Sequence, residues 1–355
     1  MLGNQADAQS SNDKQYEKFI ESVGFSAPRS DSTNRSMLRG YNIAFLTATA
    51  TAFEPVGRPR MPRSHQLVMS AASDDLFSAY AAKAPPVQGR LSGRCWDIVD
   101  RVLEVTVPDA QSDATAFDGA LEAFVAAGPD DPSLIPEEQR ALVTSLSDTA
   151  ASYSVLKDSK CLSWGTRYRT LNAPLGAFFC GISLWPKTTV DVPNFTLYFG
   201  SGSAVNPDRV FMRLECIPRV DTDMNAAYAE KYYAPFNPRY FAFLHDADFE
   251  PYVSDSAYAR GAQSPSGLRY FFDGTEANME LVTATALELA GQWANFVDSA
   301  ADLTPKAAEA MAKRDAIIRR VAAENSPDNA NRERVFGSTA FARTKALLSG
   351  DGSLR

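Results

Sequence analysis

Apolar residues follow a helical spacing in the N-terminal part of the chain. Between residues 95 and 105, and again between 115 and 127, they recur every three or four positions and so share one side of a helix. Residues 74–82 predict a shorter helix, and Pro136 with the acidic residues after it is typical of a further helix start. The prolines and glycines of residues 85–93 predict a break. This part is therefore expected to be mainly helical.

From residue 160 onward the spacing changes to patterns typical of strands. Four such stretches follow one another, at residues 162–171, 176–185, 194–200 and 209–217. Their connections are short, and residues 201–208 have the composition of a hairpin turn. Consecutive strands joined in this way pair antiparallel, so the sequence predicts an antiparallel sheet.

Helical spacing returns after the sheet, at residues 224–233, 277–300 and 305–325. In the last of these, Glu309 and Lys313 stand four positions apart, which favours an ion pair on a solvent-facing side. Strands followed by helices are typical of the α+β class. We expect one domain over residues 74–350, in which a mainly helical part (74–157) precedes a sheet with C-terminal helices (158–350).

Composition and charge exclude several classes of function. The chain of 355 residues has a formal net charge of −8, which argues against binding to nucleic acid. Its four cysteines lie far apart and it has two histidines, so neither a zinc site nor an iron–sulfur cluster is expected. No apolar run reaches the roughly 18 residues that a membrane span requires.

The first 73 residues have the composition of a targeting segment. Residues 37–53 combine a methionine, a basic residue, an apolar run and small residues before a cleavage point, as signal peptides do. The arginine-rich stretch that follows resembles a transit peptide. Together they resemble the two-part plastid address of algae with secondary red plastids, so we expect Met37 to be the true start and the mature protein to begin near Ala71. A polar tail with a chance motif is the alternative.

One segment, residues 249–265, has neither helical nor strand periodicity. Two prolines bracket it, and hydroxyl residues, Tyr252, Tyr258 and Arg260 fill it. Such a segment is expected to lie across another part of the protein. Its side chains suit a large, flat, carboxylated ligand, although a well-packed connection would have a similar composition.

The same segment is similar to a motif of a known family. Residues 251–265 follow the pattern Pro-Tyr-Val-Ser-x-Ser-x-x-x-Arg-x-x-x-Ser-Pro. Three further blocks agree in the same order, and these are Pro193-Asn194-Phe195, the set from Arg219 to Tyr233, and Arg334-Val-Phe-Gly337. Over about residues 161–348 the chain thereby resembles the red chlorophyll catabolite reductases, which are relatives of the ferredoxin-dependent bilin reductases.

The resemblance implies a fold and an activity. The fold would be an α/β/α sandwich that holds a linear tetrapyrrole between its antiparallel sheet and the C-terminal helices. Such reductases bind no flavin or metal, and electrons pass from reduced ferredoxin to the pigment itself. Red chlorophyll catabolite or a related chlorophyll-derived bilin would be the substrate, in the plastid stroma. A non-catalytic carrier and a bilin reductase that acts on a different double bond are the alternatives, and a homodimer stays open.

Two positions are candidates for proton donation. Tyr198 stands where the family has a glutamate, and a phenol can donate a proton or a hydrogen bond but is a weaker acid. Asp328 is nearest to the second carboxylate of the family, just before the Arg-x-Phe-Gly block. Core packing is the alternative role for Tyr198, and helix capping is that for Asp328.

Four further residues are candidates for substrate binding. Arg260 would pair with a propionate, because a guanidinium binds carboxylates through two hydrogen bonds. Gln263 occupies the position that governs product stereochemistry in the family, and Ser264 follows it. Asn194 would contact the ligand or fix a turn, and Arg260 could instead form a structural salt bridge. An acidic ferredoxin would dock on a basic face, and the arginines of the sheet region are Arg167, Arg169, Arg209, Arg213 and Arg219.

Overall fold

The strands of the protein form a single antiparallel sheet. The computed structural model describes residues 77–108, 111–118, 149–157, 159–173, 176–201, 206, 208–254, 256–326, 329, 333, 341–342 and 344–350. The strands are β1 (Gln111–Asp118), β2 (Thr149–Lys157), β3 (Leu162–Asn172), β4 (Ala177–Pro186), β5 (Asn194–Ser201), β6 (Arg209–Ile217), β7 (Phe249–Pro251) and β8 (Leu268–Asp273). They follow the order β1-β2-β3-β4-β5-β6-β8-β7, and every neighbouring pair is antiparallel.

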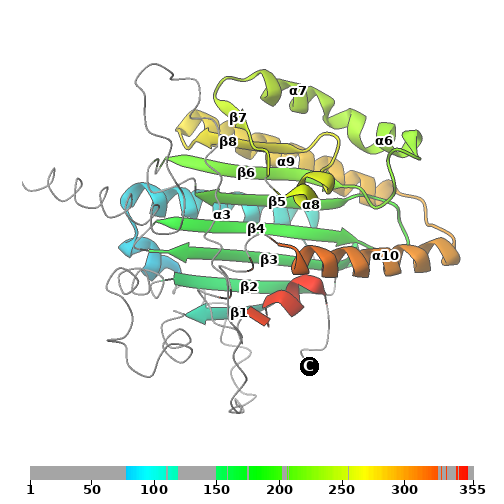
Figure 1. Ribbon diagram of the computed structural model, residues 1–355, viewed down its shortest axis with the longest axis horizontal. Coiled ribbons are helices and arrows are strands. Elements are labelled where there is room, and N and C mark those ends of the chain that lie inside the picture. The colour runs from blue at the N-terminus through cyan, green and yellow to red at the C-terminus, as the bar shows by residue number, and fades with distance from the viewer. Residues whose placement is uncertain are drawn as a thin grey trace, which may run out of the picture.

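Helices lie on both faces of this sheet (Figure 1). Their bounds are α3 (Pro86–Thr106), α6 (Ala226–Tyr233), α7 (Asn237–His245), α8 (Ala257–Gly261), α9 (Glu276–Ser299) and α10 (Pro305–Glu324). Helices α3 and α9 cover one face, which we call the back face, and α8 and α10 lie over the other, the front face. The predicted α+β class, with a central antiparallel sheet between helices, is confirmed.

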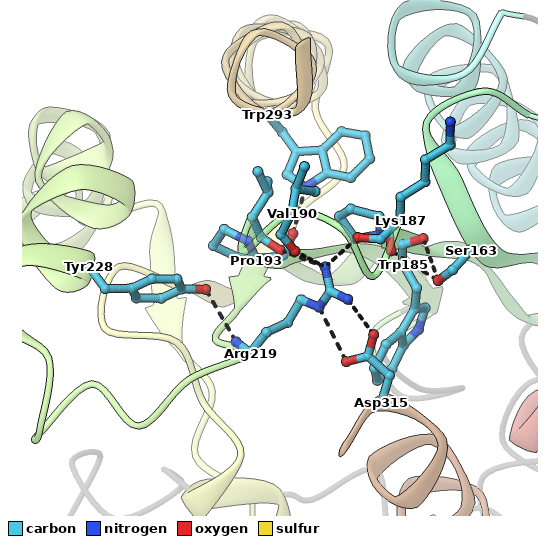
Figure 2. A network of polar contacts seen from close by, with 11 residues as sticks. Ser163, Trp185, Lys187, Val190, Pro193, Arg219, Tyr228, Trp293 and Asp315 are labelled. Carbon is cyan, nitrogen blue, oxygen red and sulfur yellow. Dashed lines mark hydrogen bonds and ion pairs between the residues drawn. The ribbon is translucent and has the colours of Figure 1, made fainter. Parts of the chain in front are cut away.

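The back face holds the hydrophobic core, because strand alternation sends one side chain in two toward α3 and α9. On β5 these are Phe195, Leu197 and Phe199, and all three are fully buried. Trp293 of α9 packs against them. Its ring lies 5.8 Å from that of Phe195, and its Nε1 donates to the carbonyl of Pro193 at 2.8 Å (Figure 2). Apolar burial on this side therefore fixes the register of the central strands.

The helix boundaries follow ordinary capping rules. Asn225, Thr275 and Thr304 accept hydrogen bonds from backbone amides in the first turns of α6, α9 and α10, which leaves fewer donors unpaired there. The three helices predicted at 224–233, 277–300 and 305–325 are confirmed within two residues. Glu309 and Lys313 form the predicted ion pair at 2.6 Å, and both are exposed.

Two predictions for the N-terminal part need correction. The break predicted over residues 85–93 is confined to residues 84–85, because α3 begins at Pro86 and continues through Gly89. Proline at the first helical position needs no amide partner, and a Cβ at Gly89 would lie 2.8 Å from the carbonyl oxygen of Ala81. The glycine therefore serves close packing between two helical segments.

Residues 115–118 belong to strand β1 and not to the predicted helix over 115–127. Phe117 pairs with Ala151 on β2 in an eight-residue ladder, and this pairing outweighs the local apolar spacing. Residues 119–127 and Pro136 lie outside the described residues. The predicted helical part thus contributes two strands, β1 and β2, to the sheet.

A buried arginine attaches α10 to the sheet. Arg219 follows β6, and its Nη1 donates to the carbonyls of Lys187, Val190 and Val192 at 3.2, 3.0 and 3.4 Å. Its Nε and Nη2 donate to the carboxylate of Asp315 on α10, and neither side chain has any exposed surface (Figure 2). The connection between β4 and β5, the end of β6 and α10 are thereby held together.

Candidate functional site

The front face of the sheet has a chemical character quite unlike that of the back face. The cross-strand pairs Thr166–Ser183, Ser183–Thr196 and Thr196–Glu215 place four polar residues in one row across β3, β4, β5 and β6. Side chains directly opposite one another on an antiparallel pair are close neighbours. The row is therefore a continuous line of hydroxyl groups that ends in a carboxylate.

A row of aromatic residues runs beside it. Tyr153 stacks on Tyr168 with ring centroids 5.5 Å apart, and Tyr168 lies 5.5 Å from Tyr198. Phe179 joins them at 5.7 Å from Tyr168. Gly181 stands between Tyr168 and Tyr198 in the register, and a Cβ there would lie 2.2 Å from Cδ1 of Tyr198. The glycine thus makes room for the Tyr198 ring to lie over β4.

Several buried polar side chains on this face have no hydrogen-bond partner among the described residues. Among them are the amide of Asn194 and the hydroxyls of Thr166 and Thr196, although these residues are at most 3% exposed. Buried polar groups in proteins are almost always paired, with the protein, with water or with a ligand. The front face is therefore chemically incomplete by itself, and these groups could donate to and accept from a polar ligand.

An ionic cluster closes the polar row. Glu215 accepts from Nη2 of Arg269 at 2.7 and 2.9 Å, and from Nε of Arg213. Burial by itself would raise the pKa of Glu215, but the two guanidinium groups outweigh it and hold that pKa below its ordinary value. Glu215 is therefore ionised at neutral pH, so it is a hydrogen-bond acceptor and not a proton donor.

The segment predicted to lie across the protein contacts this cluster. Its five-residue helix α8 provides the carbonyl of Ala259, which accepts from Nη1 of Arg269 at 3.3 Å. The amide of Ser264 donates to Glu215 at 3.2 Å. Because it is anchored at both points to the front face, the segment borders the polar row.

The structure brings some of the predicted site residues together. Asn194 and Tyr198 stand two residues before and two residues after Thr196 on β5, so all three share the front face. Ser264 lies beside Glu215. Gln263 is half-buried in the same segment. Arg260 is exposed and donates to the carbonyl of Ser254 at 2.7 Å, so one of its hydrogen bonds stabilises its own loop.

Asp328 and the Arg334–Gly337 block lie outside the described residues, as do residues 1–76.

Sequence reasoning missed Thr166, Thr196, Arg213 and Glu215 as parts of the site. Their signal was the polar half of each strand alternation, since Asn194, Thr196 and Tyr198 interrupt apolar residues on β5. Polar residues in a central strand that is covered on both faces indicate a ligand or an ion pair.

The arginines of the sheet do not share one face. Arg167 and Arg169 lie against Trp96 of α3 on the back face, with each guanidinium carbon within 4.5 Å of the ring centroid. Arg209 pairs with Glu250 on β7, Arg213 is on the front face, and Arg219 is fully buried. These five side chains therefore form no single basic surface.

Comparison with solved structures defines the class of fold. The crystal structure of phytochromobilin synthase from tomato in complex with biliverdin matches with a TM-score of 0.51 and 14% sequence identity, over 59% of this chain and 73% of that chain. At this identity the likeness concerns the fold alone. The chain thus has the α/β/α sandwich fold of the class that includes phytochromobilin synthase.

Sequence comparison points to one family. The family described as red chlorophyll catabolite reductase (RCC reductase) matches residues 178–347. The red chlorophyll catabolite reductase of Hordeum vulgare is 27% identical over 173 residues, which are 46% of this chain and 82% of that protein. Residues 178–347 are therefore similar to the red chlorophyll catabolite reductase family, and the resemblance inferred from the sequence motifs is confirmed.

No helix among the described residues is both long enough and apolar enough to cross a membrane.

Proposed function

We propose that the protein reduces a linear tetrapyrrole, with red chlorophyll catabolite or a related chlorophyll-derived bilin as substrate and reduced ferredoxin as electron donor. The pigment would lie on the front face of the sheet, between the aromatic row and the front-face helices. Similarity to the family gives the reaction class, and the front face supplies groups that suit such a ligand.

The unpaired polar groups are the observation that carries the proposal. A linear tetrapyrrole presents pyrrole N–H donors, carbonyl acceptors and carboxylates along a flat, apolar body. Asn194, Thr166 and Thr196 offer unused donors and acceptors at buried positions. The rings of Tyr168 and Tyr198 lie beside them and offer flat apolar surface.

The protein's part in the reaction would be to orient the pigment and to deliver protons. Reduction of one double bond requires two electrons, which ferredoxin supplies singly, and two protons. A proton donor must lie within hydrogen-bond distance of the atom that receives the proton. Tyr198 is the donor that we propose on the front face, and Asp328 is the candidate for the second proton.

An anaerobic assay tests the proposal. The purified protein is mixed with reduced ferredoxin and red chlorophyll catabolite, and the loss of pigment absorbance is followed over time. We expect bleaching that depends on both proteins and that is strongly reduced in Tyr198→Phe, while the pigment still binds. Absence of bleaching with red chlorophyll catabolite and with biliverdin would refute a reductase function.

A non-catalytic tetrapyrrole carrier is the second candidate. The observation that favours it is Tyr198 itself, because a phenol replaces the carboxylate of the family. A carrier would shift the absorbance spectrum of the pigment on binding and would show no turnover with reduced ferredoxin. A bilin reductase with another target bond would bleach a different pigment, and the product spectrum would identify the bond.

We also propose that the protein acts in the plastid stroma. The basis is the two-part targeting pattern of residues 1–73 and the need for ferredoxin as donor. A fluorescent protein fused after residue 73 should enter the plastid in a diatom or a similar alga, and a fusion that lacks residues 37–53 should remain outside.

A further inference from the structure

The ionic cluster on the front face carries more positive than negative charge. Arg213 and Arg269 share the single carboxylate of Glu215, and Arg269 engages both of its oxygens. Arg213 donates to Glu215 only through Nε, and its Nη1 and Nη2 have no acceptor among the described residues. One positive charge, with two NH2 groups that have no acceptor among the described residues, is thus left over. It lies on Arg213, whose side chain has the largest exposed fraction of the three, 24%.

Tyr198 lies next to this surplus charge. It is the cross-strand partner of Arg213, whose guanidinium carbon lies 5.8 Å from the centroid of the Tyr198 ring. Burial lowers the pKa of Arg213, but Glu215 and then Tyr198 raise it by a larger amount, as expected for a cation beside groups that can be negative.

Other ionisable groups also face this pair. They are Tyr168 on β3 with Tyr153 behind it on β2, Glu215 and Arg269 on β6 and β8, and Tyr258 on α8. Three of them are phenols, which are neutral at pH 7, and the remaining two form the ion pair of the cluster. The surplus positive charge of the cluster is therefore carried by Arg213, the cross-strand partner of Tyr198.

We infer that Arg213 is the positioning residue of Tyr198, and that its guanidinium stabilises the negative charge left on the phenolate oxygen after Tyr198 has donated its proton. The inference rests on the proposed reductase function. In the step, one electron from ferredoxin enters the pigment, the O–H bond of Tyr198 breaks, and the proton forms a new bond to the reduced pigment. The phenolate then takes a proton from solvent.

The same charge explains why a phenol can serve at this position. A carboxyl group beside an arginine has its pKa lowered by about one to three units, so it would be ionised at neutral pH and would have no proton to give. A phenol has an ordinary pKa near 10 and keeps its proton beside the same arginine. Tyr198 and Arg213 are therefore matched, whereas a glutamate at position 198 would need a neutral neighbour.

Four variants test this pairing in the full-length protein. Arg213→Gln removes the charge, Arg213→Lys keeps it, Tyr198→Glu restores the carboxylate of the family, and the fourth combines Tyr198→Glu with Arg213→Gln. The measurements are turnover as a function of pH with ferredoxin and red chlorophyll catabolite, and the pH titration of ¹³Cζ-labelled tyrosine by NMR without substrate. Tyr198→Phe assigns the resonance of Tyr198.

In Arg213→Gln we expect the ionisation midpoint of Tyr198 and the alkaline limb of turnover to move up by about one pH unit. Turnover at neutral pH should fall by up to about tenfold, because the phenol becomes a tenfold weaker acid. Arg213→Lys should retain most of both properties. Tyr198→Glu should be nearly inactive at pH 7, and the added Arg213→Gln should restore part of its turnover. Arg209→Gln, on the same strand but paired with Glu250, should leave the Tyr198 titration unchanged.

The outcomes separate this inference from the proposed function. Turnover with an unchanged Tyr198 titration and pH profile in Arg213→Gln would overturn the inference and leave the reductase function in place. The inferred pairing of Tyr198 with Arg213 would also be overturned if Tyr198→Glu were equally inactive with and without Arg213→Gln, in proteins that still bind pigment. If the unaltered protein shows no turnover, the proposed function fails, and the NMR titration still decides whether Arg213 stabilises the ionised phenol.

Discussion

Two arginines on or just after β6, the fully buried Arg219 and the half-buried Arg213, differ in how completely their guanidinium groups are paired. Arg219 donates to three backbone carbonyls and to both oxygens of Asp315, so its guanidinium has partners on every side. Arg213 donates only to Glu215, which Arg269 also holds. The first cluster is closed and neutral as a pair, whereas the second is open and carries a surplus positive charge.

The difference indicates what each cluster is for. A closed network ties chain segments together, and Arg219 joins the β4–β5 connection to α10 (Figure 2). An open network keeps donors available for another molecule or for a change of charge. The same contrast holds between the two faces of the sheet, since the back face is filled with apolar side chains and the front face has unpaired polar groups.

The largest effect on stability is expected at the closed cluster. Asp315→Ala leaves the fully buried Arg219 without its counter-ion, and breaking a buried pair in this way costs about 3–5 kcal/mol. Chemical denaturation should show this loss in the free energy of unfolding. Glu309→Ala, on the same helix but exposed, is the control. A loss below about 1 kcal/mol for Asp315→Ala would contradict the view that the closed cluster holds α10 in place.

A smaller and pH-dependent effect is expected at the open cluster. Glu215→Gln should destabilise the protein by about 2 kcal/mol at pH 7, because hydrogen bonds to a charged group are lost. The folded-state pKa of Glu215 is lower than its ordinary value of 4.5, so its stabilisation is present above pH 4.5 and is lost as the pH falls through the folded-state value.

The difference between the unaltered protein and Glu215→Gln should therefore shrink as the pH is lowered from 7 to below 4.5. Thermal unfolding across this range measures it. A difference that stays constant with pH would contradict a lowered pKa of Glu215 in the folded protein.

Removal of an unpaired buried hydroxyl should raise the stability of the free protein and lower its affinity for the pigment. Thr196→Val replaces an unpaired buried hydroxyl by a methyl group, so the free protein should gain about 1 kcal/mol of stability. Its affinity for the pigment should fall about tenfold if Thr196 bonds to the ligand. Fluorescence quenching on titration with biliverdin measures the affinity.

Thr285→Val is the matched control for this experiment. Thr285 lies on α9, is fully buried, and has an unpaired hydroxyl of its own, but it is remote from the front face. It should gain similar stability and keep the affinity of the unaltered protein. Equal affinities in the two valine variants would remove Thr196 from the site.

The smallest effect is expected on the surface of α10. Lys313→Ala removes the exposed ion pair with Glu309, and such pairs contribute about 0.5 kcal/mol or less. Neither the unfolding midpoint nor the pigment affinity should change measurably. A larger loss would mean that the outer side of α10 has a partner.

From residue 162 onward, the strands and helices that the sequence predicted could be recognised from the local spacing of apolar residues. Alternation placed β3, β4, β5 and β6, and helical spacing with capping residues placed α6, α9 and α10. The short strands β7 and β8 and the helices α7 and α8 were not predicted. They lie in or beside a segment rich in Pro, Ser and Gly, where β8 pairs with β6 on one side and with β7 on the other.

The sequence suggested some residues of the front face as candidates. Asn194 and Tyr198 were chosen because the family motif covers β5, and Ser264 because it stands near the end of the bracketed segment. Glu215 and Arg213 stand in no motif, and their nearness to Tyr198 depends on which residues face each other across β5 and β6. Arg260 was the candidate carboxylate partner from residue type alone, and the structure shows it bonded to Ser254 within its own loop.

The sequence by itself determined the class of fold, the order of the main elements and the likeness of residues 178–347 to a known family, since periodicity and short motifs are local properties of the chain. The tertiary structure decided that Arg219 is enclosed while Arg213 keeps free donors beside Tyr198. Two arginines on one strand and its continuation have the same local chemistry. Only the packing of distant segments, α10 against one and the open front face against the other, distinguishes a structural charge from one that is available to a ligand.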